Sequence, residues 1–251
     1  SNLNVVRSDQ PGGLFGFATG ATIKNLKFDG GVIDHTEATD IDMSAVDDPT
    51  GNINKLPLAG SLVGLGSDLT IDNIQTNVPV YTNRVLGVSG GLVGALFPNN
   101  LFNLGDRSTY ASSITNIALN NDVEGYVAGG VIGATLPSFM LLGTTTVENL
   151  ENAKINISDI NRTGDVTCTQ ACAGGIALSA ITTTITNFEN SGNVTADLNL
   201  DLNTSAIPLN CSFQSAGGIV GAQLKFPLII DKSSNSGNIS STSIGTTTSC
   251  N

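Results

Sequence analysis

The sequence lacks tryptophan entirely, and tyrosine and phenylalanine together bring the aromatic content to only 5%. A hydrophobic core must therefore be assembled from isoleucine, leucine, valine and alanine, within a hydrophobic content of 40%. Charged residues are also scarce, at 12%, so the residues that favour helices, such as glutamate, lysine and arginine, are few. Because β-branched residues are abundant and glycine interrupts every helical window, we expect an all-β fold.

Basic side chains are also scarce. The sequence has 10 lysines and arginines against 21 aspartates and glutamates, which gives a formal net charge of −11. Such a field repels phosphate backbones and anionic membranes, which argues against a nucleic-acid partner. The sequence shows no apolar run near the roughly 20 residues that a membrane span needs, and no signal peptide begins it. We expect a single domain over residues 1–251, which is a mature segment or a fragment of a longer repeat protein.

A glycine-containing apolar pentad, for example Gly90-Gly91-Leu92-Val93-Gly94, recurs along the whole sequence. The copies begin at Gly12, Gly60, Gly90, Gly129, Gly174 and Gly217. Because the spacing between copies varies, a fixed core with loops of varying length is indicated. We interpret the glycines as residues that punctuate turns.

Two further apolar positions follow each pentad. A leading aliphatic residue, which precedes an asparagine by two positions, stands at Ile23, Ile71, Ile114, Val147, Ile185 and Ile230. The asparagines are Asn25, Asn73, Asn116, Asn149 and Asn187, whereas Lys232 replaces the asparagine in the last copy. The third apolar position is filled by Val32, Val80, Val123, Val194 and Ile239, with Asn156 in the fourth copy.

Three short strands per repeat predict a right-handed parallel β-solenoid, or β-helix, of about six coils with variable loops. Stacked coils place equivalent residues about 4.8 Å apart. We therefore expect an asparagine ladder at one corner and an inward apolar stack of Leu92, Val131, Ile176 and Ile219. Strand edges at both ends would favour self-association.

The pairing of G-G-L-V-G with I-x-N-x-x-x-x-G-x-V resembles the GLUG repeats of bacterial and some eukaryotic surface proteins. The best copy leads from Ala173-Gly174-Gly175-Ile176 to Ile185-Thr186-Asn187-Phe188-Glu189-Asn190-Ser191-Gly192-Asn193-Val194. A weaker similarity links the chain to the repeats of chlamydial polymorphic outer-membrane proteins. The resemblance covers nearly the whole chain and implies a β-helical adhesin or surface protein without shared catalytic residues.

Modification sites gather in the second half of the chain. The N-x-S/T sequons, which are candidate glycosylation sites, are Asn156, Asn161, Asn193, Asn203, Asn210 and Asn238. Four cysteines suit two disulfides in an oxidising compartment. Equivalent spacing to the pentads favours Cys211 with Cys250 and a local bond between Cys168 and Cys172. The alternatives are a Cys168–Cys211 bond, or four reduced thiols in a cytosolic protein.

Residue patterns for catalysis are weak. The single histidine, His35, has no marked partners for a triad, and we interpret it as a surface residue. The densest acidic segment holds Asp34, Glu37, Asp40, Asp42, Asp47 and Asp48. Calcium could bind to Asp40, Asp42, Asp47 and Asp48, but the spacing is not that of an EF-hand, and a solvated acidic loop is favoured. No other cofactor is expected.

The main hypothesis is an extracellular structural or adhesive glycoprotein, a protomer of a surface filament, sheath or wall, rather than an enzyme. A carbohydrate-binding or carbohydrate-cleaving β-helix is the first alternative, with glycans as partners. An ice-binding solenoid is the second, suggested by threonine runs at residues 144–146, 182–184 and 246–248. Irregular spacing between the repeats argues against that second alternative.

Overall fold

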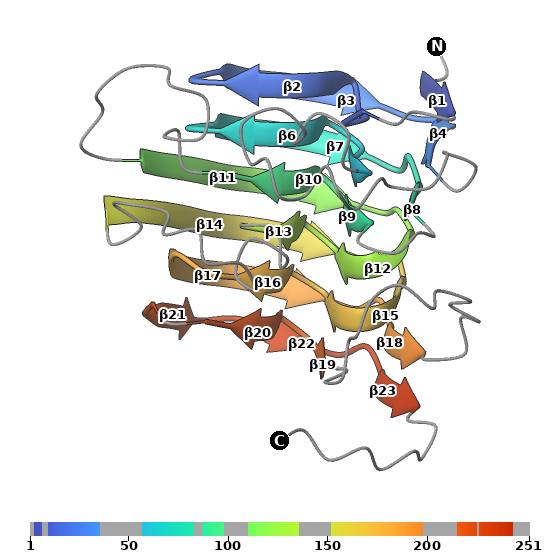
Figure 1. Cartoon of the computed structure of the whole chain (residues 1–251). Coiled ribbons are helices and arrows are strands. Elements are labelled where there is room, and N and C mark those ends of the chain that lie inside the picture. Colours follow the sequence, from blue (N-terminus) through green and yellow to red (C-terminus); the bar gives the residue numbers. More distant parts are fainter. Residues whose placement is uncertain are drawn as a thin grey trace, which may run out of the picture.

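A computed structural model describes residues 3–6, 10–35, 57–82, 87–97, 110–135, 152–197, 215–224 and 226–242. These residues form strands almost throughout, and the pairs between the strands are parallel (Figure 1). The chain visits the same sheets in the same order again and again, so the all-β expectation is confirmed. The arrangement is consistent with a parallel β-helix.

The strands belong to three sheets, which we name A, B and C. Sheet A contains β1 (Leu3–Val6), β4 (Gly31–Asp34), β5 (Leu58–Gly60), β8 (Val80–Thr82), β9 (Val88–Gly90), β12 (Val123–Gly129), β15 (Val166–Ala173), β18 (Val194–Asp197), β19 (Ser215–Gly217) and β23 (Ile239–Thr242). Sheet B contains β2 (Phe15–Thr19), β6 (Val63–Ser67), β10 (Val93–Leu96), β13 (Ile132–Ala134), β16 (Ile176–Ser179) and β20 (Val220–Gln223). Sheet C contains β3 (Thr22–Phe28), β7 (Thr70–Thr76), β11 (Tyr110–Leu119), β14 (Ala153–Arg162), β17 (Thr182–Asn190), β21 (Leu228–Asp231) and β22 (Ser234–Asn235).

A corner divides each long strand of sheet C, and it is formed by residues with left-handed backbone. Their φ angles lie between 49° and 58°, a region in which asparagine and aspartate are tolerated better than other residues with side chains. The corner residues are Asn25, Asn73, Asn116, Asp159, Asn187 and Lys232. The predicted ladder is thus present, except that Asp159 takes the place assigned to Asn149.

At the fourth rung the register predicted from the sequence is wrong. Ile157, rather than Val147, pairs with Ile114 and Ile185. Val147 and Asn149 lie outside the described residues. The third apolar position shifts in the same way, because Val166 pairs with Val123 and Val194 where Asn156 was expected. In the first copy, Ile33 rather than Val32 pairs with Val80.

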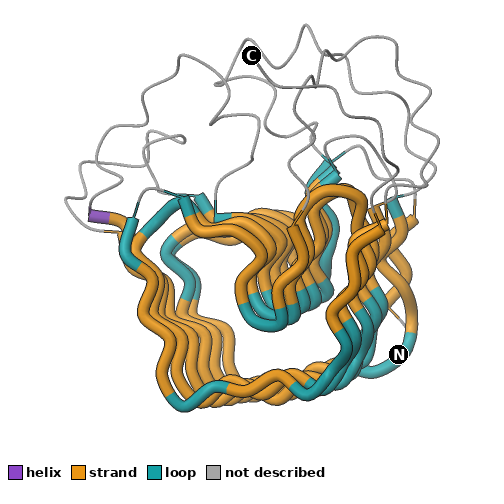
Figure 2. Tube along the Cα trace, turned by 90° about the horizontal axis from the view of Figure 1, so that it is seen from below, coloured by secondary structure: helices purple, strands orange, loops and turns teal. Residues whose placement is uncertain are grey.

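The pentads lie in the part of the cross-section that turns inward, which Figure 2 shows as a bend inside the outer wall. Every residue of β5, β6, β9 and β10 is buried, so this infolded segment is enclosed on both faces. Alternation of buried and exposed residues persists only in the outer strands, such as β11 and β14. The infolded segment therefore supplies the interior against which sheets A and C pack.

The pentad glycines allow close packing of neighbouring backbones. A side chain on Gly133 would place its Cβ 2.6 Å from the carbonyl oxygens of Gly94 and Ser89. On Gly94 the Cβ would lie 2.8 Å from the backbone nitrogen of Ala59. Because both glycines have ordinary negative φ angles, it is the approach of neighbouring backbones that requires them. Gly91, Gly130 and Gly174 also lie at bends between strands of sheets A and B, as predicted, so close packing is a requirement in addition to the turns.

The predicted inward stack holds in part. Leu92 and Val131 are fully buried and hydrogen-bonded through their backbones, and Ile219 continues this column at the far end. The intervening rung is Gly175, because Ile176 pairs with Ile132 in the adjacent column.

The aromatic ring of Phe188 compensates for the side chain missing at Gly175. Phe188 stands in register with Ile160, where the other central strands of sheet C also carry isoleucine. Its ring would lie 3.4 Å from a Cβ on Gly175. A larger residue on sheet C thus fills the volume that a smaller residue on the infolded segment leaves empty, as close packing requires.

Candidate association surface

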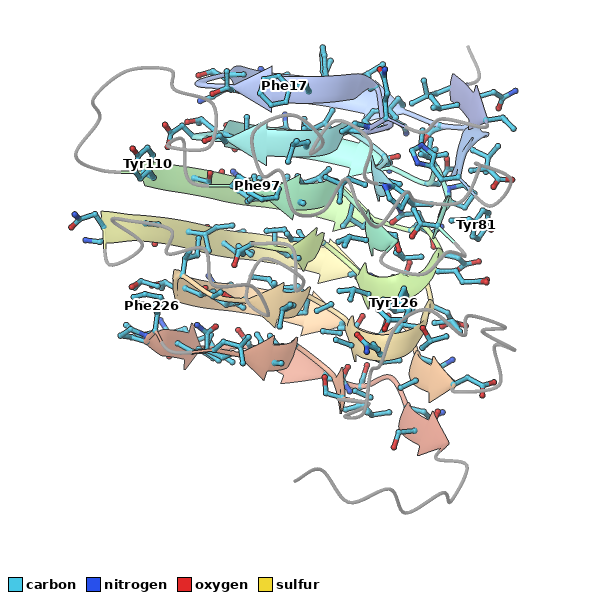
Figure 3. All side chains as sticks on the ribbon, viewed as in Figure 1. Phe17, Tyr81, Phe97, Tyr110, Tyr126 and Phe226 are labelled. Carbon is cyan, nitrogen blue, oxygen red and sulfur yellow. A yellow bond between two sulfur atoms is a disulfide. The ribbon has the colours of Figure 1, made fainter. Side chains whose placement is uncertain are left out.

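Columns of apolar side chains run through the stack of strands. They are buried in the middle of the stack and exposed at its two ends. Figure 3 shows Phe17 on the first strand of sheet B and Phe226 near the last strand of sheet C. The exposed large hydrophobic residues of the described chain are Val6, Leu14, Phe15, Phe17, Ile229, Ile230 and Ile239. All of them except Leu14, which directly precedes β2, lie in the first or last strand of a sheet. In intermediate strands, equivalents such as Val63 and Ile185 are fully buried.

Sheet A presents the best-matched pair of edges. Val5 of β1 pairs with Ile33, and Ile239 of β23 pairs with Val194, so both belong to the same apolar column. Ile239 is 49% exposed because no further strand in the described residues covers it. No described strand pairs with the outer edges of β1 and β23, and both edges carry aliphatic side chains in equivalent places.

Side-chain hydrogen bonds tie neighbouring corner residues together on the outside. Asn73 donates to Asn25 Oδ1 at 2.7 Å, and Asn187 donates to Asp159 Oδ1 at 2.9 Å. Asn116 instead donates to Asp72 Oδ1 at 2.8 Å. That bond, a bond from Thr115 and the charge of Lys24 lower the pKa of Asp72. The ladder is a structural device, because its members bond to one another.

A buried polar column runs behind the corner on the inner side. Arg162 is fully buried and donates from Nη1 to Asn190 Oδ1 at 2.9 Å, and Asn190 donates to Asn235 Oδ1 at 2.6 Å. Burial lowers the pKa of Arg162 to about 10, although Asp165 and Asp122 act in the opposite direction. These long polar side chains fill the space over the pentad glycines Gly130, Gly174 and Gly218.

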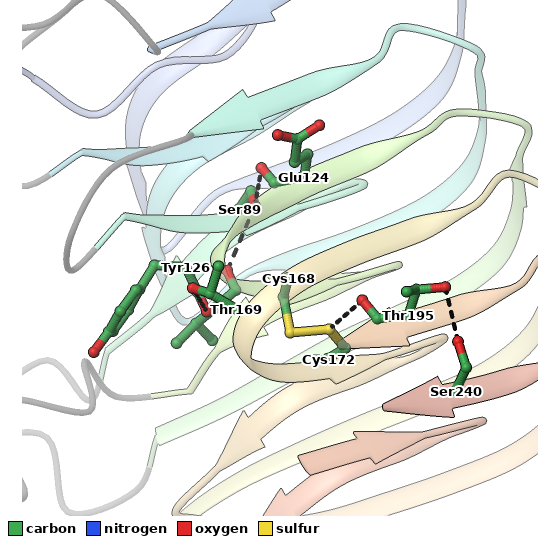
Figure 4. The surroundings of a disulfide bond; sticks show 9 residues. Ser89, Glu124, Tyr126, Cys168, Thr169, Cys172, Thr195 and Ser240 are labelled. Carbon is green, nitrogen blue, oxygen red and sulfur yellow. Dashed lines mark hydrogen bonds between the residues drawn. A yellow bond between two sulfur atoms is a disulfide. The ribbon is translucent and has the colours of Figure 1, made fainter. Parts of the chain in front are cut away.

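The local disulfide between Cys168 and Cys172 is present, with 5.6 Å between the Cα atoms (Figure 4). Between these cysteines β15 has one residue more than β12, since Cys168 pairs with Gly125 and Ala171 with Val127. The disulfide therefore closes a β-bulge. Cys211 and Cys250, the expected second pair, lie outside the described residues.

The sequons divide between exposed and undescribed positions. Asn156, Asn161, Asn193 and Asn238 are exposed, and Val194 beside Asn193 is buried, as alternation requires. The Oδ1 of Asn193 accepts a hydrogen bond from the backbone nitrogen of Asn238 at 3.1 Å. Asn203 and Asn210 lie outside the described residues. Glycosylation stays a prediction at each of these residues.

His35 is fully buried, which corrects its interpretation as a surface residue. Its ring occupies the space beside Gly12, where a Cβ would lie 2.2 Å from Nε2. The backbone nitrogen of His35 also donates to the carbonyl oxygen of Tyr81 at 2.9 Å. Packing between the first two rungs of sheet A thus accounts for this histidine.

The candidate calcium ligands Asp40, Asp42, Asp47 and Asp48 lie outside the described residues, as does Glu37, whereas Asp34 ends β4. In the part of the chain that is described, histidine, cysteine, aspartate and glutamate form no group suited to a metal ion. The described residues also contain no helix long and apolar enough to cross a membrane.

The threonine run at residues 182–184, the one that lies within the described part of the chain, is not continued on the neighbouring strand β14. Thr182, Thr184 and Thr186 alternate with buried residues on β17 and are partly exposed. The adjacent rung on β14 carries Lys154, Asn156 and Ser158 at the paired positions. The other two threonine runs lie outside the described residues.

Comparison of the chain with protein-family models, with curated proteins and with solved structures finds no match.

Proposed function

We propose that this chain is an extracellular structural or adhesive glycoprotein module whose copies associate end to end. The proposal includes a right-handed parallel β-solenoid of about six coils, because crossovers between parallel strands are right-handed in nearly all proteins. The resemblance to GLUG-repeat surface proteins favours the same role. The observation that carries the proposal is the pair of matched, uncovered edges of sheet A.

The contact that we propose joins β23 of one copy to β1 of the next in parallel. Backbone groups along the two edges would form the same hydrogen bonds that link strands inside the sheet. Ile239 would then lie over Val5 of the neighbour and continue the column that runs through Ile33 and Val194. Burial of half-exposed aliphatic side chains stabilises such a contact by roughly 25 cal/mol per Å² of apolar area.

The extracellular part of the proposal is supported by two features. The Cys168–Cys172 disulfide is of a kind that persists in oxidising compartments. Four of the sequons have exposed asparagine side chains. Intact-mass measurement of the secreted protein before and after glycosidase treatment tests the modification, and an unchanged mass would count against it.

Sedimentation velocity over a range of concentrations tests the association. Ile239→Asp would place a charge against Val5 of the neighbour, so we expect the concentration-dependent growth in mass to disappear. Ala118→Asp is the matched control, because it adds the same charge at an exposed position of β11, a central strand of sheet C that lies away from both ends of the stack. The control should still associate. A wild-type chain that stays monomeric at high micromolar concentration would overturn the proposed contact.

A further inference from the structure

A hollow of about 230 Å³ with polar side chains around an apolar floor opens on the outer surface where sheet C leads into sheet A. Its walls and floor come from the first four rungs of the stack. The lining residues are Asp29, Gln75, Thr76, Asn77, Ala118, Leu119, Asn120, Asn161 and Thr163. Ala118 and Leu119 are apolar, the others are polar, and Asp29 is the only charged group among the described lining residues.

The hollow exists because of one small residue. Gln75, Ala118 and Asn161 stand in register on neighbouring strands and form a column on the outer face of sheet C. The methyl group of Ala118 leaves open the volume that a longer side chain would fill. The two amide side chains therefore form opposite walls, about two interstrand spacings or ~10 Å apart at their backbones, over an apolar floor.

Two further amides at the rim are held in fixed orientations through their oxygen atoms. Asn77 Oδ1 accepts a hydrogen bond from the backbone nitrogen of Gly30 at 2.9 Å. Asn120 Oδ1 accepts one from the hydroxyl of Thr163 at 2.6 Å. Their Nδ2 groups have no hydrogen-bond partner within the described residues, so two positioned donors remain beside the acceptor Asp29.

We infer that this hollow binds one pyranose sugar unit, a hexose or an N-acetylhexosamine. Sugar hydroxyls donate and accept at once, so they match amide donors and acceptors together with a carboxylate. A pyranose ring also has an apolar C–H face, which can lie on the methyl group of Ala118. The volume is below the usual 300 to 1,000 Å³ of small-molecule sites, which limits the ligand to roughly one ring.

The sugar can come from two sources. One is a glycan on a partner surface, which would make the hollow an adhesive subsite. The other is the chain's own glycan, because Asn161 is both a sequon residue and a wall of the hollow. In that case Asn161 Nδ2 bonds to the sugar C1 and loses a proton, while the bond from C1 to the diphosphate of a lipid-linked donor breaks.

Saturation-transfer NMR tests the shared chemistry with unglycosylated protein and the methyl glycosides of glucose, mannose, galactose and N-acetylglucosamine. We expect transfer to at least one sugar, and its loss in Ala118→Arg, which fills the hollow. Ala111→Arg is the matched control, because Ala111 is also an exposed alanine of β11 but lies outside the hollow. No transfer in the wild type, or equal loss in both variants, would overturn the inference.

Protein secreted from a eukaryotic host separates the two sources. If the chain's own glycan occupies the hollow, added sugar binds to the unglycosylated wild type but not to the glycosylated wild type. If an external glycan is the ligand, both proteins bind it. The inference deepens the adhesive part of the proposed function, yet the two fail separately. Ala118→Arg should leave end-to-end association unchanged in the sedimentation experiment.

Discussion

At the scale of single residues, the left-handed corners of sheet C explain why asparagine recurs. A left-handed backbone costs most residues roughly 1–2 kcal/mol, and asparagine tolerates it while its side chain bonds to the neighbouring rung. Lys232 adopts φ of 49° at the last corner, so the degenerate sixth copy keeps the conformation without the favoured residue. Backbone geometry is thus conserved along the stack even where the side chain changes.

Substitutions at Asn187 separate the backbone effect from the hydrogen bond. Asn187→Ala should destabilise the fold by roughly 1–2 kcal/mol, because it loses the bond to Asp159 and strains the left-handed backbone. Asn187→Gly removes the same bond but tolerates the φ angle, so it should cost less. Urea unfolding followed by far-UV circular dichroism measures both, and equal losses would contradict the account of the corner.

Burial of Tyr126 predicts a dependence of stability on alkaline pH. Desolvation raises the pKa of Tyr126 to about 12 from 10, so the unfolded chain ionises first as the pH rises. Between pH 10 and 12 the unfolded state binds fewer protons than the folded state, and stability must fall. Tyr126→Phe should lose less stability than the wild type from pH 9 to pH 11. Parallel unfolding curves for both proteins check this.

At the scale of elements, the infolded segment can form because its glycines allow neighbouring backbones to approach closely. A methyl group on Gly133 would meet the backbone oxygens of Ser89 and Gly94 in the neighbouring rung, and backbone cannot move aside as a side chain can. Gly133→Ala should therefore destabilise strongly, by about 3 kcal/mol or more. Gly20→Ala is the control. It has open space around it and should cost only the roughly 1–2 kcal/mol of its left-handed φ. Similar losses in thermal unfolding would contradict the close-packing role.

Sequence patterns predicted the elements that have a strict residue requirement. The corner asparagines and the pentads could be found because a left-handed φ and close backbone contact each restrict the residue type. The fourth repeat misled because Val147-Glu148-Asn149 mimics the corner pattern, while the actual corner, Ile157-Ser158-Asp159, carries aspartate. A four-residue pattern of common residues cannot exclude such a coincidence.

Other features depend on neighbours in space and have no local signal. Burial of His35 depends on the missing side chain at Gly12, and Phe188 is matched to Gly175 across the interior. The hollow depends on Ala118 lying between two longer amides of adjacent rungs. Once the register is known, each of these pairs can be found by aligning the repeats. A one-residue error in that alignment is enough to assign a residue to the wrong column, as happened to Ile176.

At the scale of the whole molecule, end-to-end association must overcome the repulsion between copies with net charge −11. Repulsion between solvent-exposed charges is screened beyond about 8 Å at physiological salt, whereas contact between the aliphatic edges of β1 and β23 is not weakened by salt. Association should therefore strengthen as the salt concentration rises from low values. An interface dominated by ion pairs would respond in the opposite way.

Electron microscopy of the native protein at physiological salt shows whether copies associate end to end. We expect filaments one molecule wide, in which successive copies continue the parallel strands of sheet A along the filament axis. Ile239→Asp should yield single particles under the same conditions, while Ala118→Asp, which changes a central strand, should still yield filaments. Isolated particles of the wild-type chain at every concentration would contradict end-to-end association, as would filaments that persist in Ile239→Asp.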